Sequence, residues 1–432
     1  MDSIWTDNIR LPHFSQLEGS YKTDVLIIGG GMAGILCAFF LQKKGIDYML
    51  VEGSRICGGV TGNTTAKITC QHGLIYDKLI KKAGPEKAKL YLEANKNSIK
   101  KYSELCEHIH CDFEIKPAYV YSLHDRKKLE REAQALDKLG FHAEITDTDE
   151  LPFPTAGAIC FQHQAQFHPL KFISQIARGL NIYEHSFVRE LSENTAVTDK
   201  GRIAFQKIIF ATHFPIDNKH GMYFLKMYQH RSYVIALEHA AQVNGLYLDE
   251  ARGGMSFRSY KDLLLLGGGS HRTGKKGGNW GELRDFAATY YPSAVEQYHW
   301  AAQDCMTLDG IPYIGQYSRS MPECFVAAGF NKWGMTSSMT AAMVLADLVM
   351  GKANPYAEVF SPSRNMLKPQ LVFNGWEAGV NLLSPAKKRC PHLGCALKWN
   401  GAEHSWDCPC HGSRFDDGGR LLDNPANGNL KR

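Results

Sequence analysis

The stretch TDVLIIGGGMAGILCAFFLQKKGIDYMLVEG, at residues 23–53, contains a strand, a turn, a helix and a second strand in succession. Residues 25–28 form a short apolar β run, and residues 32–44 carry apolar side chains at helical spacing. Residues 48–52 form a second run that suits a buried strand. This order predicts the first unit of an α/β domain with a parallel sheet.

A glycine motif lies where the first strand meets the helix. Gly29, Gly31 and Gly34 have the spacing G-x-G-x-x-G, which permits a tight turn, a close approach to a pyrophosphate and close helix–strand packing. The N–H groups at the helix N-terminus suit phosphates. Glu52 ends the second strand, where a carboxylate can bind ribose hydroxyls. The pattern predicts a dinucleotide site, whereas a tight turn with no ligand would leave Glu52 unexplained.

The composition of the 432-residue chain is that of an ordinary globular protein and favours two or three domains. Hydrophobic residues make up 44% of the chain, which is enough for a large core. The net charge of +5 comes from scattered basic residues, so nucleic-acid binding is not indicated. No apolar run has the length of a membrane span, and the N-terminus has no apolar signal region. We therefore expect a cytoplasmic protein with no membrane span.

The middle of the chain changes from helical to β-type patterns. Between residues 233 and 269, four short β runs are separated by turn residues, which predicts an antiparallel sheet inserted into the first domain. The apolar runs at 207–213 and 324–330 are expected to return to the parallel sheet. Residues 334–351 are expected to form a helix rich in small residues.

Three further segments resemble the flavoprotein family that includes D-amino-acid oxidase, sarcosine oxidase and glycine oxidase. They are EGSRICGGVTGNTTAKIT at 52–69, DGIPYIG at 309–315 and VAAGFNKWGM at 326–335. The resemblance implies that the dinucleotide is FAD and that Arg55 and Thr61 lie near its pyrophosphate. By the same resemblance, the residues near the flavin ring are Gly329, Lys332, Trp333, Gly334 and Met335.

This family oxidises C–N bonds of amines and amino acids by hydride transfer from the carbon beside the nitrogen. A second nucleotide site is not indicated, because the run Gly267–Gly269 lacks the required spacing and is better explained as a strand end entering a loop. We therefore expect the electrons to come from an organic substrate. Either of two arginines could bind a carboxylate through two hydrogen bonds, although each could also have an ordinary surface or interdomain role. The candidate substrate contacts are Arg231, Tyr233, Arg258 and Lys332.

Four of the twelve cysteines are concentrated near the end of the chain, and the other eight are expected to be small buried residues. The segments CPHLGC at 390–395 and CPCHGS at 408–413, called box 1 and box 2 below, also contain two histidines. Two cysteines and two histidines could bind zinc. The C-x-H spacing is unusual for a zinc finger and leaves two cysteines without a role, so zinc is the weaker alternative.

The two boxes closely resemble those of Rieske [2Fe–2S] proteins. The resemblance implies that Cys390 and Cys408 bind one iron and that His392 and His411 bind the other. It also implies a disulfide between the two remaining cysteines, Cys395 and Cys410, as in the high-potential members of that family.

This chain departs from the Rieske pattern in two respects. In the high-potential members a Ser and a Tyr donate hydrogen bonds to cluster sulfurs, and this chain has Ser413 but Phe415 in place of the Tyr. We therefore expect a reduction potential below that of the respiratory type. A full Rieske domain also has several strands before box 1, and most of them are missing here. The boxes are therefore expected to rest on the flavin domain itself.

The sequence thus predicts an α/β fold. It comprises an FAD-binding Rossmann-like domain of the glutathione-reductase and D-amino-acid-oxidase type, an inserted antiparallel-sheet substrate domain and a small C-terminal all-β Rieske module. The flavoprotein would occupy residues 1–365, a linker 366–389 and the module 390–432. The expected FAD-binding segments are about 21–70, 180–215 and 305–355, and the substrate domain about 71–179 and 216–304.

Both cofactor motifs on one chain favour an enzyme that oxidises an amine or amino acid and relays electrons between FAD and a [2Fe–2S] cluster to an external acceptor. One alternative is an electron-transfer protein fed by a partner reductase, which NAD(P)H-driven reduction through a second protein would favour. Another is a non-catalytic redox or metal sensor, which zinc without turnover would favour.

Overall fold

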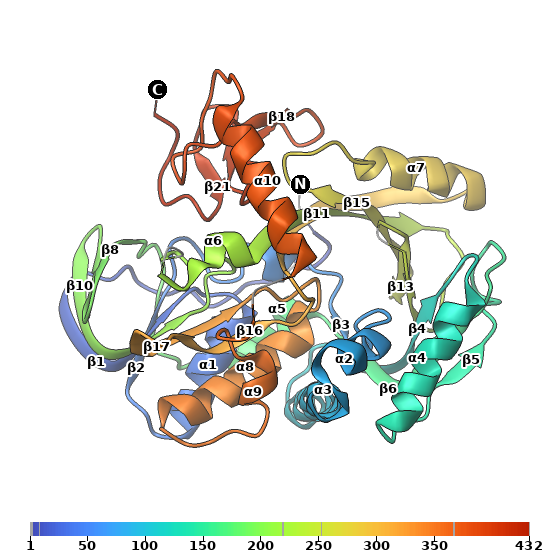
Figure 1. Ribbon diagram of the computed structural model, residues 1–432, viewed down its shortest axis with the longest axis horizontal. Coiled ribbons are helices and arrows are strands. Elements are labelled where there is room, and N and C mark those ends of the chain that lie inside the picture. The colour runs from blue at the N-terminus through green and yellow to red at the C-terminus, as the bar shows by residue number, and fades with distance from the viewer. Residues whose placement is uncertain (1–2, 8, 218–219, 252, 366–367, 432) are drawn as a thin grey trace.

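The computed structural model describes residues 3–7, 9–217, 220–251, 253–365 and 368–431 (Figure 1). The first sheet is largely parallel, with β1 paired to β10 and β2, and β10 paired to β17. An antiparallel hairpin, β8 (Val188–Ser192) and β9 (Thr195–Thr198), extends from β10. The strand order of the first sheet is β16 (Tyr313–Ser318), β17 (Met321–Ala328), β10 (Gly201–Phe210), β1 (Gly19–Ile28), β2 (Tyr48–Val51) and β7 (Ile182–Tyr183). The runs at 207–213 and 324–330 therefore return to the parallel sheet, as predicted.

Two of the predicted helices pack together beside this sheet. α1 (Met32–Lys43) follows the glycine motif, and α8 (Gly334–Val349) is the helix rich in small residues. Both are buried over most of their surface, which explains why neither has a clear polar face. Short helices α5 (Pro169–Ile176) and α9 (Ala357–Phe360) complete this region.

The second sheet is the inserted one and is mostly antiparallel. Its order is β15 (Val295–Thr307), β11 (Met227–Glu238), β14 (Leu263–Arg272), β13 (Ser256–Tyr260), β12 (Leu246–Asp249), β4 (Glu114–Tyr121), β6 (Ala158–Gln166) and β3 (Lys67–Ile68), with β5 (Glu144–Thr146) paired to β6. The run Gly267–Gly269 lies inside β14, whose pairing with β11 continues to Arg272. The expectation that it ends a strand was therefore wrong.

The remaining helices flank the inserted sheet or join the two sheets. These elements are α2 (Tyr76–Ala83), α3 (Pro85–Cys106), α4 (Arg126–Lys138), α6 (Tyr223–Lys226), α7 (Asn279–Tyr290) and the 3₁₀ turns η1 (Val60–Asn63) and η2 (His220–Met222). Gly84, which has a positive φ of 87°, separates the first two of these helices.

The C-terminal module is a small antiparallel sheet with a helix before it. Its strands are β18 (Lys398–Asn400), β19 (Ser405–Asp407), β20 (Arg414–Asp416) and β21 (Leu421–Asp423). The segment expected to be a linker, 366–389, contains helix α10 (Pro369–Leu383). In Figure 1, α10 and the module lie over the β11–β15 end of the inserted sheet.

The observed fold has the predicted class: an α/β domain, an inserted antiparallel sheet and a small all-β C-terminal module. Among the described residues, no helix is long and apolar enough to cross a bilayer.

Candidate active site

A cavity of about 1200 Å³ lies at the carboxyl ends of the parallel strands. This is where open α/β sheets bind their ligands. It is lined by the turn after β1, the end of β2, the loop after β10, strands of the inserted sheet and residues 416–429 near the C-terminus. Its volume exceeds that of an ordinary small-molecule pocket, so it can hold a dinucleotide together with a substrate.

The glycine turn leaves room that no other residue would leave. Gly29 has a positive φ of 111°, and a Cβ atom there would lie 2.5 Å from the Ala211 carbonyl oxygen. A Cβ on Gly34 would lie 1.9 Å from the Gly29 carbonyl oxygen. Gly31 is the N-cap of α1 and lines the cavity. The N-terminus of α1 therefore faces the cavity through a side-chain-free turn, which suits a pyrophosphate.

Three further predicted residues line the same part of the cavity: Glu52, Arg55 and Thr61. The Glu52 carboxylate accepts hydrogen bonds from the backbone N–H of Gly30 at 2.7 Å and of Ser54 at 2.8 Å. Burial raises the pKa of Glu52, although these hydrogen bonds oppose the rise. Thr61 Oγ1 accepts from the Met32 N–H at 3.0 Å, at the start of α1. Arg55 Nε donates to Glu184 Oε1 at 3.0 Å.

The segment predicted to face the flavin ring lies at the other end of the cavity, which it lines with Gly329, Lys332, Trp333, Gly334 and Met335. Lys332 Nζ donates to Ser232 Oγ at 2.9 Å, and that hydroxyl donates to Asp304 Oδ2 at 2.9 Å. Enclosure lowers the pKa of Lys332, and the charge of Asp304 opposes this shift. Trp333 stacks on His72 with ring centroids 4.7 Å apart.

These residues fit FAD. The cavity is large enough, its phosphate end is a glycine turn at a helix N-terminus, and its other end carries the segment that the family resemblance assigns to the flavin ring. Cys305 also lines the cavity, and burial raises the pKa of its thiol.

The structure does not place the two predicted arginine clamps in the cavity. Arg231 binds Glu403 of the C-terminal module, with Nε to Oε1 at 2.9 Å. Arg258 is fully buried and donates to the carbonyl oxygens of Thr65 and Ala66. Tyr233 lines the cavity, but its hydroxyl donates to Glu403 Oε1 at 2.9 Å. Neither arginine lines the cavity in this structure, and a substrate role for Arg231 and Arg258 stays a prediction from the sequence.

Sequence reasoning missed Lys67, which lines the cavity from β3. Its Nζ donates to the Tyr247 carbonyl oxygen at 3.2 Å. Burial, with a smaller effect from the charge of Arg258, lowers the pKa of Lys67 to about 7. A single lysine in a two-residue strand gives no pattern by which it could have been found.

The two boxes bring the four predicted cluster ligands together. The rings of His392 and His411 lie with centroids 4.9 Å apart at 89°. His411 Nδ1 is buried and has no hydrogen-bond partner among the described residues. Hydrogen bonds from Cys390 and two other thiols hold the pKa of Cys408 well below its ordinary value. Two thiols and two imidazoles form the donor set of a Rieske [2Fe–2S] cluster, so the residues fit that group.

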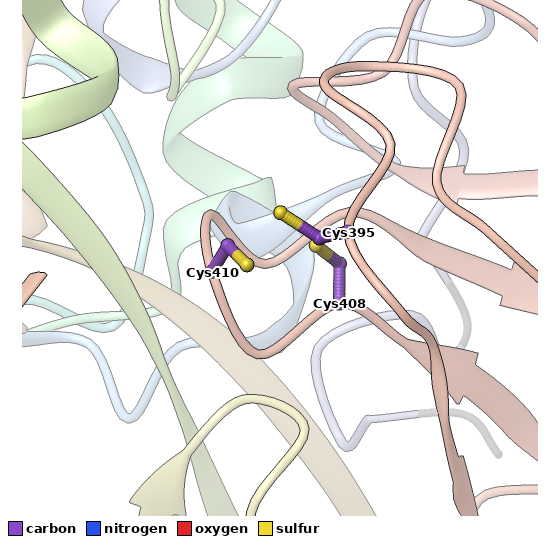
Figure 2. A group of neighbouring side chains, drawn as sticks. All are labelled: Cys395, Cys408 and Cys410. Carbon is purple, nitrogen blue, oxygen red and sulfur yellow. The ribbon is translucent and has the colours of Figure 1, made fainter. Parts of the chain in front are cut away.

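The remaining two cysteines lie beside this ligand set. The sulfur atoms of Cys395, Cys408 and Cys410 lie within 4.8 Å of one another (Figure 2). Cys395 and Cys410 are free thiols in this structure, so their disulfide stays a prediction. Ser413 hydrogen-bonds the Cys390 thiol, and its role as a donor to a cluster sulfur stays a prediction. Phe415 is fully buried.

Box 2 rests on the inserted sheet, as the short chain before box 1 predicted. Gln229 Nε2 of β11 donates to the His411 carbonyl oxygen at 3.0 Å, and Gln303 Nε2 of β15 donates to that of Gly412 at 2.8 Å. Gln303 precedes Asp304, which lines the cavity. Residues 420–424 and 426–429 of the module also line the cavity, so the module borders the cavity directly.

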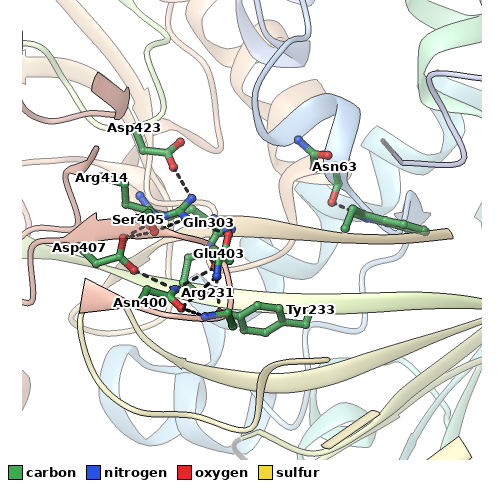
Figure 3. A network of polar contacts seen from close by, with 12 residues as sticks. Asn63, Arg231, Tyr233, Gln303, Asn400, Glu403, Ser405, Asp407, Arg414 and Asp423 are labelled. Carbon is green, nitrogen blue, oxygen red and sulfur yellow. Dashed lines mark hydrogen bonds and ion pairs between the residues drawn. The ribbon is translucent and has the colours of Figure 1, made fainter. Parts of the chain in front are cut away.

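A buried polar network fastens the rest of the module to the same strands (Figure 3). Glu403 binds both Arg231 of β11 and Arg414 of β20, and all three side chains are at most 7% exposed. Arg414 also binds Asp407 and Asp423, each at 3.0 Å. Burial raises the pKa of Glu403, but Arg231 and Arg414 outweigh burial, and the net shift is downward.

Comparison with known proteins supports the assignment of both the flavin domain and the C-terminal module. The family described as FAD dependent oxidoreductase (DAO) matches residues 24–348, and the Rieske [2Fe-2S] domain matches residues 377–432. Protein YhfW of Bacillus subtilis (strain 168), whose name describes a Rieske 2Fe-2S iron-sulfur protein, is 34% identical over 100% of this chain and 97% of its own length.

Two solved structures have a similar fold over most of the chain. Glycine oxidase from Geobacillus kaustophilus has a TM-score of 0.67 at 20% identity and covers 80% of this chain and 99% of its own. L-proline dehydrogenase from P. horikoshii has a TM-score of 0.68 at 17% identity and covers 80% of this chain and 98% of its own. The chain therefore belongs to the DAO family of FAD-dependent oxidoreductases and carries a C-terminal Rieske domain, so its cofactors are FAD and a [2Fe–2S] cluster.

Proposed function

We propose that this protein oxidises the C–N bond of an amine or amino acid and that the electrons pass between FAD and the Rieske cluster to an external acceptor. Bound FAD would accept a hydride from the substrate carbon, and the cluster would carry electrons one at a time. The substrate nitrogen loses a proton in the same reaction, and the product leaves as an imine.

The observation that supports the relay is that the module borders the cavity. Residues 420–424 and 426–429 of the module line the cavity together with Asp304 of β15, and Gln303 of the same strand holds the box 2 backbone. Gln229 makes a second anchor from β11. Because the same two strands contact both the cavity and box 2, the proposed cofactor sites lie close enough for electrons to pass between them.

The substrate class rests on the lysines of the cavity. Lys67 and Lys332 line it, and either ammonium group can bind the carboxylate of an amino acid, in place of the arginines predicted from sequence. The names of the two similar solved structures specify glycine and L-proline. Both are amino acids, which supports an amino-acid or related amine substrate here.

An anaerobic titration with candidate amines and amino acids tests the proposal. We expect one of them to bleach the flavin absorbance and to produce the EPR signal of a reduced Rieske cluster in the same sample. A cluster that stays oxidised while the flavin bleaches would contradict the relay. Reduction by NAD(P)H that needs a second protein would favour the partner-fed alternative instead.

A variant without a cluster ligand separates the two steps. Cys408→Ser should remove the cluster, because one of its two thiolate ligands is lost. Substrate should still bleach the flavin, whereas reduction of an added one-electron acceptor should fall sharply. Unchanged acceptor reduction in this variant would show that electrons leave by another route.

A further inference from the structure

Helix α10 has its polar and apolar faces in the reverse of the usual arrangement. Its side chains Asn374 and Asn381 are buried against the protein, at 5% and 4% exposure. Its large apolar side chains face outward: Val372 is 75% exposed, Phe373 64%, Trp376 70%, Val380 43% and Leu383 87%. A helix on a water-exposed surface places such residues inward. The outward face is therefore built to be covered.

The inner face of α10 explains why the helix cannot simply turn over. Asn374 Nδ2 donates to the Leu225 carbonyl oxygen at 3.1 Å, and its Oδ1 accepts from Arg272 at 3.0 Å. The Asn381 carbonyl oxygen accepts from the Ala396 N–H, directly after box 1, at 2.9 Å. These buried polar contacts fix which face points outward, because breaking them would leave buried groups unpaired.

The surroundings of the apolar face are basic. The only acidic residue of α10, Glu377, is paired with Lys275 at 2.7 Å. Lys368 precedes the helix, and the run Lys387–Arg389 follows it. An exposed ridge of Trp, Phe and Leu with basic groups at both ends is typical of helices that lie in the interface of an anionic bilayer.

We propose that α10 docks this protein on an anionic lipid surface, with its apolar face in the boundary between headgroups and acyl chains. A second copy of the chain fits less well. In a two-fold pair of antiparallel α10 helices, the basic run after one helix would face Lys368 of the other, so like charges would meet. An anionic surface complements both ends at once.

The docking stands on α10 alone and does not depend on the relay. If the relay proposed above holds, docking has a consequence for the acceptor. Box 1 and box 2 lie against the inner face of α10, and a helix is about 10 Å thick. The lipid surface would therefore lie about one helix away from the cluster, within reach of an acceptor dissolved in the bilayer.

Vesicle binding by the holoprotein tests this proposal. We expect co-sedimentation with vesicles of equimolar phosphatidylglycerol and phosphatidylcholine, and much weaker binding to phosphatidylcholine alone. Trp376→Glu should weaken binding about tenfold or more, because a large apolar side chain leaves the interface. Lys387→Gln should weaken it about fivefold on the anionic vesicles only, as the loss of one surface charge predicts.

Ile115→Glu is the matched control. Ile115 is 51% exposed on β4, so the same kind of change is made away from α10, and it should leave vesicle binding unchanged. Wild-type protein that binds neither vesicle overturns the proposal. A dimer in solution that Trp376→Glu dissociates, without vesicle binding, would overturn it in favour of a second copy. Equal loss in the Ile115→Glu variant would also overturn it.

Discussion

Lys67 is a cavity-lining cation whose charge changes near neutral pH. Burial lowers its pKa to about 7, so the side chain is charged below that pH and neutral above it. If Lys67 binds a substrate carboxylate, the KM for an amino acid should rise with pH above about 7, by up to about tenfold per unit. The kcat should change less. Steady-state kinetics between about pH 6 and pH 9 measure this.

Two variants separate Lys67 from other titrating groups. Lys67→Arg keeps a positive charge through the whole range, so its KM should rise little with pH. Lys67→Gln should have a high KM at every pH. A wild-type rise that persists unchanged in Lys67→Arg would show that another group is responsible.

A second prediction at the residue scale concerns Phe415. The side chain is fully buried beside the boxes and has no hydroxyl. Phe415→Tyr should add a donor to the cluster and raise its reduction potential, by about 60 mV if the new hydrogen bond is worth about 1.4 kcal/mol. Redox titration followed by EPR measures the shift. Phe415→Met, which adds no donor, should leave the potential nearly unchanged, and an equal rise there would contradict the explanation.

At the residue scale, the sequence predicted the local motifs and failed on the long-range pairs. The roles of the glycine motif and the Cys–His boxes depend on close neighbours in the chain. The role of Arg231 depends on Glu403, which is 172 residues away. No spacing reveals that pair, and an arginine beside aromatic residues suits a substrate clamp equally well.

The turn between β1 and α1 is the element on which FAD binding depends. A Cβ on Gly34 would overlap the Gly29 carbonyl oxygen at 1.9 Å, so Gly34→Ala must push α1 away from β1. Such overpacking costs about 1–3 kcal/mol and moves the N–H groups that face the phosphates. We expect Gly34→Ala to be purified with much less FAD, as visible absorbance will measure. Gly379→Ala should keep normal flavin content, because a Cβ atom there has none of the described residues outside its own helix turn within 4 Å.

At the element scale, α10 is the segment that sequence reasoning did not find. It contains Gly375 and Gly379, which are poor helix formers, and its apolar residues do not face a core. Both features made the segment look irregular. Its helix is held by contacts with Leu225 and Ala396, which lie outside it. By contrast, α1 and β2 could be predicted because local pattern and tertiary burial agree there.

At the scale of the whole molecule, the sequence predicted the three-part layout and the missing base of the Rieske domain. It could not predict which surface replaces that base. The answer is a set of single hydrogen bonds, such as those of Gln229 and Gln303, from strands that also line the cavity. Neither glutamine belongs to a sequence motif, because each has its role only where box 2 packs against its strand.

The buried network around Glu403 holds the module in that position. Glu403→Gln would leave Arg231 and Arg414 facing a neutral amide in a nearly dry site. Breaking a buried pair in this way costs about 3–5 kcal/mol. We expect the module to loosen, so that cluster reduction slows more than flavin reduction does. Rapid mixing with substrate, followed by flavin absorbance and freeze-quench EPR, measures the two rates separately.

The charge of Glu403 also gives this prediction a pH dependence. Its net pKa is lowered in the folded protein, so its stabilisation is present above the ordinary glutamate pKa and is lost as pH falls through the lowered value. In the wild-type protein, the attachment of the module to β11 should therefore hold at neutral pH and weaken only in acid below the usual glutamate range. Glu296→Gln, which breaks the more exposed pair with Arg284, should cost at most about 1 kcal/mol and leave both rates unchanged. Equal cluster reduction rates in Glu403→Gln and Glu296→Gln would mean that the network does not hold the module to β11.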